Sequence, residues 1–153
     1  FDERENFLKK LTNKLPNIKF DIYGVGNKQP IWADNFINNL SQSKIALNLS
    51  QGNSSKYYTS DRFAQLIGNG LLVMIDKKTK FNDFFNKDEI VTYNNINDLK
   101  KKIEKYSNND ALRQKIAKKG SDKYFKYFNS TIVAEFIINK SFNSNKKYFW
   151  EKN

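Results

Sequence analysis

The sequence predicts an α/β fold, in which a parallel β-sheet is flanked by helices on both faces. The apolar run at residues 45–49 is typical of a buried strand, and residues 71–75 form a continuous apolar run of the kind found in parallel strands that are covered on both faces. A polar loop, a short helical pattern and the turn Gly68-Asn69-Gly70 lie between them, as in a βαβ unit. The expected sheet has four short strands in total, and they alternate with helices along the chain.

The N-terminal third is expected to hold a helix, a strand and a second helix. Residues 2–14 predict an amphipathic helix that ends before Pro16, because proline has no amide hydrogen to continue it. Apolar and polar residues alternate over 18–23, which predicts a strand that runs into Gly24-Val25-Gly26. Residues 35–40 predict a short helix that precedes the strand at 45–49.

The rest of the chain is expected to alternate between strand and helix and then to be helical. Ser60 is the expected N-cap of a helix that stops at Gly68. Residues 81–85 predict a helical turn whose aromatic side chains pack under the sheet, and 89–93 predict the fourth strand. Apolar residues spaced three and four apart then predict three helices, over 96–106, 110–128 and 132–142.

One domain accounts for most of the 153 residues: it spans 1–143, and a polar, aromatic tail follows over 144–153. Aromatic residues make up 15% of the chain, which is enough for a substantial core. The tail residues Tyr148, Phe149 and Trp150 either pack against an upstream part or cover a neighbouring groove. The sequence begins with an acidic segment and lacks a starting Met, so we expect a further N-terminal domain upstream.

The chain contains no Cys and no His, which excludes several kinds of chemistry. Disulfides and thiolate sites need Cys, and Ser-His or Cys-His catalytic pairs need imidazole. Asp83, Asp88 and Glu89 match no metal-site spacing, and we expect Glu89 to pair with a Lys. We therefore expect no metal and no cofactor. No apolar run approaches 18 residues, so we expect no membrane-spanning helix.

The net charge of +11 is concentrated in the second part of the chain. Residues 1–95 carry 13 basic and 10 acidic groups (+3), whereas 96–153 carry 14 and 6 (+8). The excess favours an anionic ligand or forms a solvated Lys-rich surface. Only three basic residues are Arg, the residue that most often reads bases and phosphates, so we do not expect nucleic acid as a partner. Tyr124 and Tyr127 share helical spacing with apolar residues, which indicates packing rather than base stacking.

A polar loop over residues 50–59 follows the strand at 45–49 and leads into a helix, where α/β proteins commonly bind anions. The side chains that are candidate ligands there are Lys56, Tyr58, Thr59, Ser60 and Arg62. The alternative is an ordinary polar loop in which Arg62 pairs with Asp61 or a neighbouring carboxylate.

Two further features belong to the same hypothesis. Gln65 lies three residues after Arg62, so both side chains can project to one side of the helix, where Gln65 either bonds sugar hydroxyls or faces solvent. Gly24 and Gly26 form either a tight turn or a loop that faces the ligand.

The run SDRFAQLIGNGLLVMID, residues 60–76, resembles the core motif of group 1 glycosyltransferases with the GT-B fold, and it is most similar to the spore-maturation type. That motif reads S-x-R-x-x-E, followed by a turn to glycine and an apolar strand. Residues 85–93, 97–103 and 112–120 resemble later segments of the same family, so the resemblance covers most of the chain. It implies a Rossmann-like domain, the C-terminal half of a GT-B fold, which binds a nucleotide-sugar donor.

The resemblance also assigns roles to individual residues. Arg62 falls at the motif's Arg, a diphosphate contact, Ser60 at its helix start and Gly70 at its turn glycine. Gln65 stands where the family usually has a Glu that holds donor hydroxyls, so a charge-assisted contact is lost. The implied reaction is transfer of a sugar from a nucleotide diphosphate to a hydroxyl of a glycan, lipid or protein. The family's N-terminal half binds the acceptor and often carries the catalytic base, so the catalytic residues stay unassigned.

Other hypotheses stay open at this point. Residues 57–62, YYTSDR, are also similar to the Y-x-T-E-K run of alpha-1,3-fucosyltransferases, where an acid and a Lys contact a GDP-sugar. Asp61 and Arg62 would take those places. A basic nucleic-acid-binding module and a non-catalytic remnant are alternatives of a different class. We expect a bacterial, cytoplasmic protein, with the inner face of the membrane as the alternative location.

Overall fold

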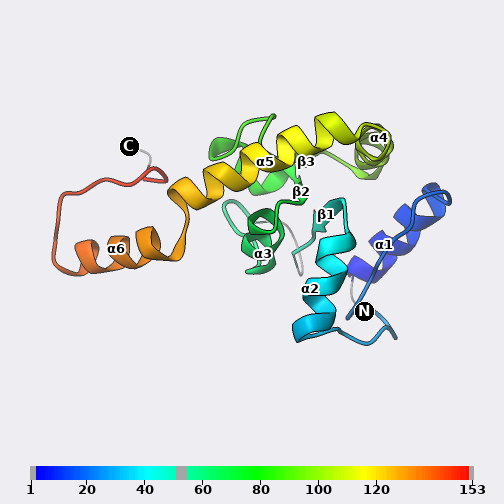
Figure 1. The fold of residues 1–153 in the computed structure, drawn as a ribbon, viewed down its shortest axis with the longest axis horizontal. Coiled ribbons are helices and arrows are strands. Elements are labelled where there is room, and N and C mark those ends of the chain that lie inside the picture. The colour runs from blue at the N-terminus through cyan, green and yellow to red at the C-terminus, as the bar shows by residue number, and fades with distance from the viewer. Residues whose placement is uncertain (1–2, 51–54, 152–153) are drawn as a thin grey trace.

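The computed structural model describes residues 3–50 and 55–151. They form a small parallel sheet with helices on both faces (Figure 1), which confirms the predicted α/β class. The elements, in chain order, are α1 (Glu3–Lys14), α2 (Ala33–Gln42), β1 (Ile45–Asn48), α3 (Arg62–Gly68), β2 (Leu72–Asp76), the short 3-10 helices η1 (Lys77–Thr79) and η2 (Phe81–Asp83), β3 (Val91–Tyr93), α4 (Ile96–Ser107), α5 (Asp110–Tyr127) and α6 (Ser130–Ser141).

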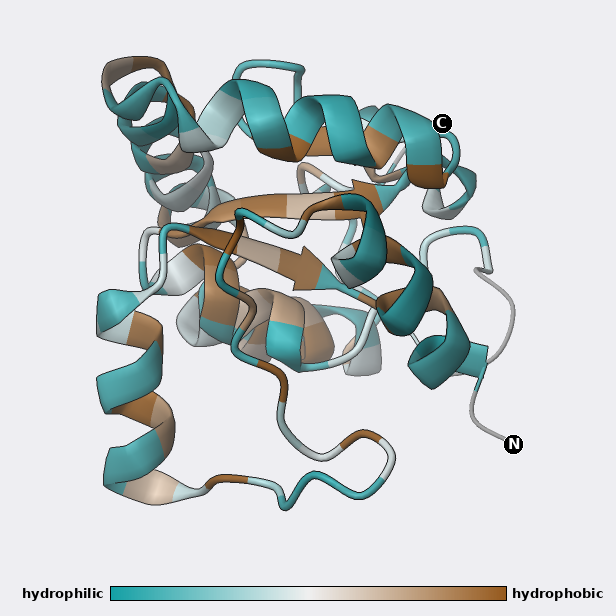
Figure 2. Cartoon of the chain, turned by 90° about the vertical axis from the view of Figure 1, so that its right-hand side faces the viewer, coloured by the Kyte–Doolittle hydropathy of each residue, from teal (hydrophilic) through white to brown (hydrophobic). Residues whose placement is uncertain are grey.

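The sheet has the strand order β1-β2-β3, and both strand pairs are parallel. The register aligns Asn48 with Ile75 and Asp76 with Tyr93, so the carboxyl ends of the three strands lie at one edge. Figure 2 shows the strands as the apolar centre of the domain, with largely polar helices around them. The loop that follows β1 therefore starts from the edge where parallel sheets bind ligands.

The side chains of β2 alternate between two hydrophobic cores, because successive residues of a strand point to opposite faces. Leu72 and Met74 belong to the core that includes residues of α1, α4 and α5. Val73 and Ile75 belong to the core on the other face, with α3 and the turn around η2. Phe81 and Phe85 are buried in that second core, which confirms the prediction for residues 81–85.

Residues 18–23 do not form a strand, contrary to the prediction. Ile18 and Phe20 pack against the first core, which accounts for the alternation of apolar residues in the sequence. The backbone hydrogen bonds at the two ends of the segment are local, from the Ile18 amide to the Leu15 carbonyl at 3.1 Å and from the Gly24 amide to the Gln29 carbonyl at 3.3 Å. The alternation of residues 18–23 thus shows which side chains face the core, but the segment has no partner strand. Over the ranges that the structure describes, the sheet has three strands.

The helix boundaries mostly agree with the sequence pattern, with two differences. α2 is longer than the predicted 35–40 helix, since it runs from Ala33 to Gln42. α3 begins at Arg62, and its N-cap is Asp61 rather than Ser60. The Asp61 carboxylate accepts a hydrogen bond from the Arg62 amide at 3.0 Å, whereas the Ser60 hydroxyl bonds the side chains of Asn48 and Arg62 and caps no amide of the helix.

The C-terminal tail folds back over the junction of α5 and α6 (Figure 1). The Trp150 ring lies 5.5 Å from that of Phe128 at the end of α5, 5.5 Å from that of Phe136 on α6, and 5.4 Å from that of Tyr148. The tail thus covers a neighbouring groove, the second of the two alternatives that the sequence left open. No helix in residues 3–50 and 55–151 is long and apolar enough to span a membrane.

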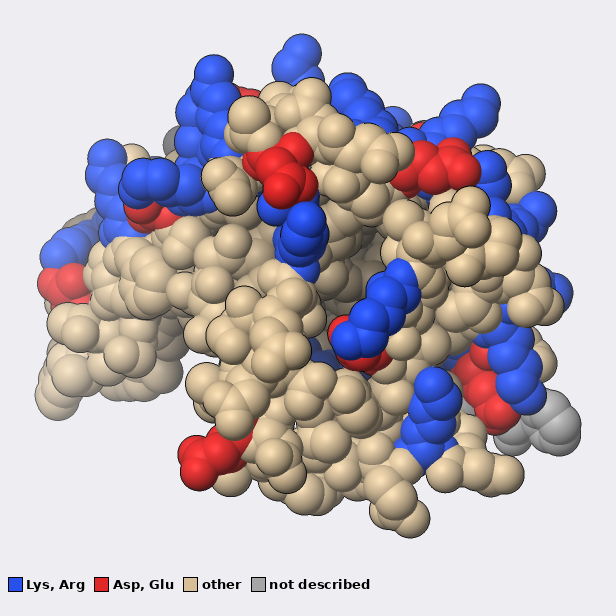
Figure 3. Space-filling model, turned by 45° about the vertical axis from the view of Figure 1, so that its right-hand side comes forward, with Lys and Arg blue, Asp and Glu red and all other residues tan. Residues whose placement is uncertain are grey.

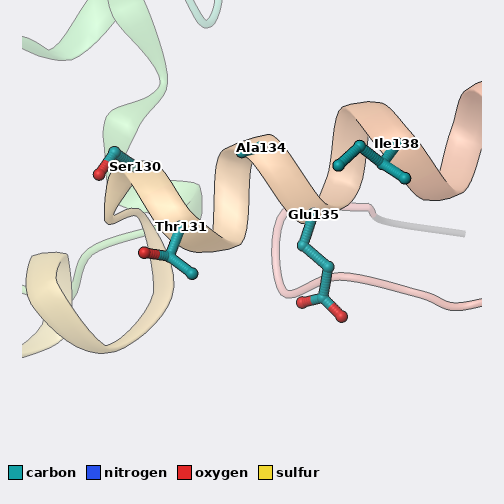
Figure 4. Close-up of a pocket in the computed structure, with 5 residues that line it drawn as sticks. All are labelled: Ser130, Thr131, Ala134, Glu135 and Ile138. Atoms are coloured by element: carbon teal, nitrogen blue, oxygen red, sulfur yellow. The ribbon is translucent and has the colours of Figure 1, made fainter.

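The outer face of α6 is apolar and exposed, including Val133, Ile137 and Ile138. A shallow pocket runs along this helix, and Figure 4 shows its lining residues Ser130, Thr131, Ala134, Glu135 and Ile138. Glu135 turns toward the returning tail, where it forms an ion pair with Lys146.

Candidate functional site

The candidate site is built on the last residues of β1, which carry an unusual buried amide. Asn48 is only 4% exposed, although the strand around it is apolar. Its Nδ2 donates a hydrogen bond to Thr59 Oγ1, and its Oδ1 accepts one from Ser60 Oγ at 3.5 Å. Asn48 thereby joins the end of the strand to the two residues that precede the N-cap of α3.

The Arg62 guanidinium is held at the same place. Its Nε donates to Ser60 Oγ at 3.3 Å and its Nη2 donates to the Leu49 carbonyl at 3.1 Å. The predicted alternative of a guanidinium paired with Asp61 is not seen, because the Asp61 carboxylate binds the backbone amide instead. Among the described residues no group accepts a hydrogen bond from Nη1 of Arg62. The exposed end of the guanidinium is thus available for an anion.

The amides of α3 form a smaller anion site than we expected from the sequence. The helix has only seven residues, so few peptide dipoles add up along its axis. Its first amide already donates to the Asp61 carboxylate. The positive charge of Arg62, rather than the helix terminus, is therefore the main attraction for an anion here.

The described part of the loop is anchored at Tyr57. The Tyr57 hydroxyl donates to Asp83 at 2.8 Å, its amide donates to the Thr79 carbonyl at 2.8 Å, and its ring packs on Phe84. The hydrogen bond to Asp83, helped by partial desolvation, raises the pKa of the Tyr57 phenol. Tyr57 adopts a φ of 60°, which is uncommon for a bulky residue. These contacts fix where the loop turns toward α3.

The other candidate ligands have distinct positions. Lys56 Nζ lies 4.7 Å from the centre of the Tyr57 ring, and Tyr58 is exposed beside it. Gln65 is exposed on α3, three residues after Arg62. Thr59 and Ser60 contact Asn48 as described above. Residues 51–54 of the predicted loop, including Gly52, lie outside the described residues.

The glycine motif forms a tight turn, which is one of its two predicted roles. Gly24 and Gly26 have φ values of 64° and 59°, in the left-handed region that favours glycine. With residues 27–30 they line a small open pocket of their own. No described contact joins this turn to Thr59, Ser60 or Arg62, so a role of these glycines in donor binding stays a prediction.

The acidic residues near β3 are engaged with lysines. Glu89 pairs with Lys123 at 2.7 Å, which confirms the expected Lys partner, and Asp88 pairs with Lys119 at 2.5 Å. The hydrogen bond from Lys119 holds the pKa of the Asp88 carboxyl below its usual value. Within the described ranges no group of three Asp or Glu residues is arranged to hold a metal ion.

The basic helices α4 and α5 show the same interleaving of charge. Lys100 pairs with Glu104 at 2.7 Å and Lys118 with Asp122 at 2.8 Å. Figure 3 shows Lys and Arg along the upper edge of one face with Asp and Glu between them. Tyr127 is half-buried and its ring stacks on that of Phe149, with 4.5 Å between the ring centres, so it packs against the tail. These contacts favour a solvated surface over a nucleic-acid interface.

Asn48 is the site residue that the sequence prediction missed. An amide within the apolar run Ile45-Ala46-Leu47-Asn48-Leu49 was a visible signal, because a buried polar group needs hydrogen-bond partners. The anchoring of Tyr57 by Asp83 had no comparable signal, since the two residues are 26 positions apart.

A family model described as glycosyl transferase-like matches residues 4–139, which include every element from α2 to α5 and nearly all of α1 and α6. Neither the curated proteins nor the solved structures contain a match.

Proposed function

The chain belongs to the glycosyl transferase-like family, and from this premise we propose that it binds the donor of a sugar-transfer reaction. The donor would be a nucleotide-diphosphate sugar, and the acceptor a hydroxyl of a glycan, lipid or protein. One observation carries the proposal: the Arg62 guanidinium is fixed at the carboxyl end of β1 with Nη1 left for a ligand. An exposed, oriented guanidinium at this edge of a parallel sheet suits a diphosphate.

The proposed roles follow from the chemistry of the step. The bond between the sugar's anomeric carbon and the β-phosphate oxygen breaks, and the nucleotide diphosphate leaves with the electron pair. The acceptor oxygen bonds to the anomeric carbon, and its proton passes to a base that we propose lies in an N-terminal half. Arg62 and Lys56 would stabilise the charge that develops on the leaving diphosphate. This stabilisation requires no metal.

The remaining candidates surround the same position. We propose that Thr59 and Ser60 shape the phosphate pocket, with Tyr58 next to it, and that Gln65 bonds the donor sugar. Gly24 and Gly26 would approach the donor from a separate turn. The fucosyltransferase-like alternative has less support, because Asp61 caps α3 instead of projecting from it. The cytoplasmic location stays a prediction.

Isothermal titration of the chain with UDP, GDP and their sugars tests the proposal. Arg62→Ala should weaken nucleotide diphosphate binding by about 10- to 100-fold, since a hydrogen bond to a charged group contributes about 1.5–3 kcal/mol. Lys118→Ala is the matched control, because it also removes one positive charge, from an exposed ion pair on α5. If no nucleotide binds, or if both variants weaken binding equally, the proposal is wrong.

A substitution at Gln65 distinguishes a catalytic site that is altered from one that is inactive. If Gln65 lowers the activity by losing a charge-assisted contact, Gln65→Glu should raise the rate of donor hydrolysis in the intact protein. A wild-type protein that binds the nucleotide, with neither form hydrolysing any donor, would favour a non-catalytic remnant.

A further inference from the structure

Asn48 carries a buried side-chain amide next to the proposed site. It lies at the end of β1, opposite Ile75 in the register, and it is only 4% exposed. Burial of an amide is unfavourable unless its donor and acceptor are both satisfied. An apolar residue would fill this position at lower cost, so the hydrogen bonds of Asn48 must explain its presence there.

Both ends of the amide bond to the segment that leads into α3. Nδ2 donates to Thr59 Oγ1, and Oδ1 accepts the longer bond from Ser60 Oγ at 3.5 Å. Ser60 Oγ accepts from Nε of Arg62 at 3.3 Å, and Nη2 of Arg62 donates to the Leu49 carbonyl, next to Asn48, at 3.1 Å. The four side chains form a closed network that begins and ends at the carboxyl end of β1.

We propose that Asn48 is a positioning residue for nucleoside diphosphate binding. It holds Thr59 and Ser60, and through Ser60 it sets the direction of the Arg62 guanidinium. This inference rests on the proposed function. Asn48 is too deeply buried to contact the ligand, so it acts on affinity only through its partners. Loss of the amide would let the segment before α3 and the Arg62 side chain adopt several arrangements, of which only some bind a diphosphate.

Titration of the full chain with UDP and GDP tests this role. Asn48→Ala and Thr59→Val should each weaken binding of the preferred nucleotide by about tenfold, the value of one or two hydrogen bonds. Because both changes break the same bond, the double variant should bind about as weakly as Asn48→Ala alone. Thr59→Ser keeps the hydroxyl that accepts from Asn48, so it should recover most of the affinity that Thr59→Val loses.

Ile75→Val is the matched control. It removes a methylene from the core at the register partner of Asn48, so it lowers the unfolding temperature and leaves the loop's hydrogen bonds in place. Its nucleotide affinity should stay within about twofold of wild type. Equal losses of affinity in Asn48→Ala and Ile75→Val would show that Asn48 has a merely structural role. The same conclusion would follow if the losses of Asn48→Ala and Thr59→Val multiplied when the two changes are combined.

A second measurement needs no ligand. The amides of Phe63 and Ala64 donate to the Ser60 and Asp61 carbonyls, each at 3.0 Å, so their hydrogen exchange reports on the order of this segment. Asn48→Ala should accelerate their exchange by about tenfold, and Ile75→Val should not. If wild type binds neither nucleotide, the proposed function is wrong. The exchange rates would still show whether Asn48 orders the segment that leads into α3. Equal exchange in the two variants overturns the inference.

Discussion

Gly120 allows α5 to lie directly against the segment that enters β3, and this contact gives a prediction with a built-in control. A Cβ atom at Gly120 would come closer than 3.0 Å to the carbonyl oxygen of Glu89 and within 3.4 Å of Ile67 Cδ1. The obstacle is backbone, which cannot rotate away as a flexible side chain can. Gly120→Ala must therefore shift α5 away from the sheet.

The expected magnitude follows from two opposing effects. Overpacking of this kind costs about 1–3 kcal/mol. Replacing Gly by Ala within a helix returns up to about 1 kcal/mol through backbone entropy. Because the obstacle is backbone, the cost of overpacking should lie in the upper part of its range, and the net result should be a loss of about 1–2 kcal/mol in the free energy of unfolding.

Gly68→Ala is the same substitution in another helix, and it serves as the control. A Cβ there would meet Phe125 at 3.7 Å and Tyr124 at 3.9 Å, which are ordinary contacts. Only the entropy gain remains, and it is smaller than in a helix interior because Gly68 is the last residue of α3, so Gly68→Ala should raise the free energy of unfolding by at most about 1 kcal/mol. Urea denaturation of both variants measures the difference. The packing argument is wrong if Gly120→Ala is as stable as wild type or as Gly68→Ala.

Two further predictions concern the tail and the acidic residues. Trp150→Ala should lower the free energy of unfolding by about 2 kcal/mol and accelerate amide exchange in α6, because the ring stacks on Phe128 and Tyr148 and meets Phe136 edge-on. The control Trp32→Ala, at a residue that is 73% exposed, should change neither the free energy of unfolding nor the exchange. Asp88 has a pKa lowered from 3.8 by Lys119, so its contribution to stability is present above pH 3.8 and is lost as the pH falls through the lowered pKa. The thermal unfolding temperatures of wild type and Asp88→Asn should therefore differ at pH 6 and converge in acid, and a difference that does not shrink as the pH falls below 3.8 would contradict this assignment.

The sequence was a good guide where burial alone determines the structure. The continuous apolar run at 71–75 correctly predicted the central strand β2, which is covered on both faces. The spacing of Ile96, Leu99, Ile103 and Tyr106 predicted α4 correctly, because these side chains form the one side of the helix that packs against the first core. At 18–23 the alternation recorded which side chains face the core, but strand formation also needs a backbone partner, which a one-dimensional pattern does not specify.

The candidate site was predicted less completely, because its hydrogen bonds join distant residues. Arg62 was a predicted ligand because of its place before a glycine turn and an apolar strand, and its binding role stays a prediction. The Ser60 hydroxyl, expected to cap α3, instead accepts a bond from Arg62, since Asp61 is one residue nearer to the helix and takes the cap. The links of Asn48 to Thr59 and of Tyr57 to Asp83 depend on the path of the loop, which local propensity does not determine.

The selectivity of the chain for a diphosphate over a monophosphate tests the central claim most directly. Titration with UDP and UMP, or with GDP and GMP if the guanine nucleotide binds better, gives the ratio of the two affinities. If Arg62 holds the β-phosphate, wild type and Lys118→Ala should prefer the diphosphate by at least about tenfold, and Arg62→Ala should lose most of that preference. An Arg62→Ala variant that keeps the full preference, or a wild type that has none, would contradict the assignment of this chain as a donor-binding domain with Arg62 at its centre.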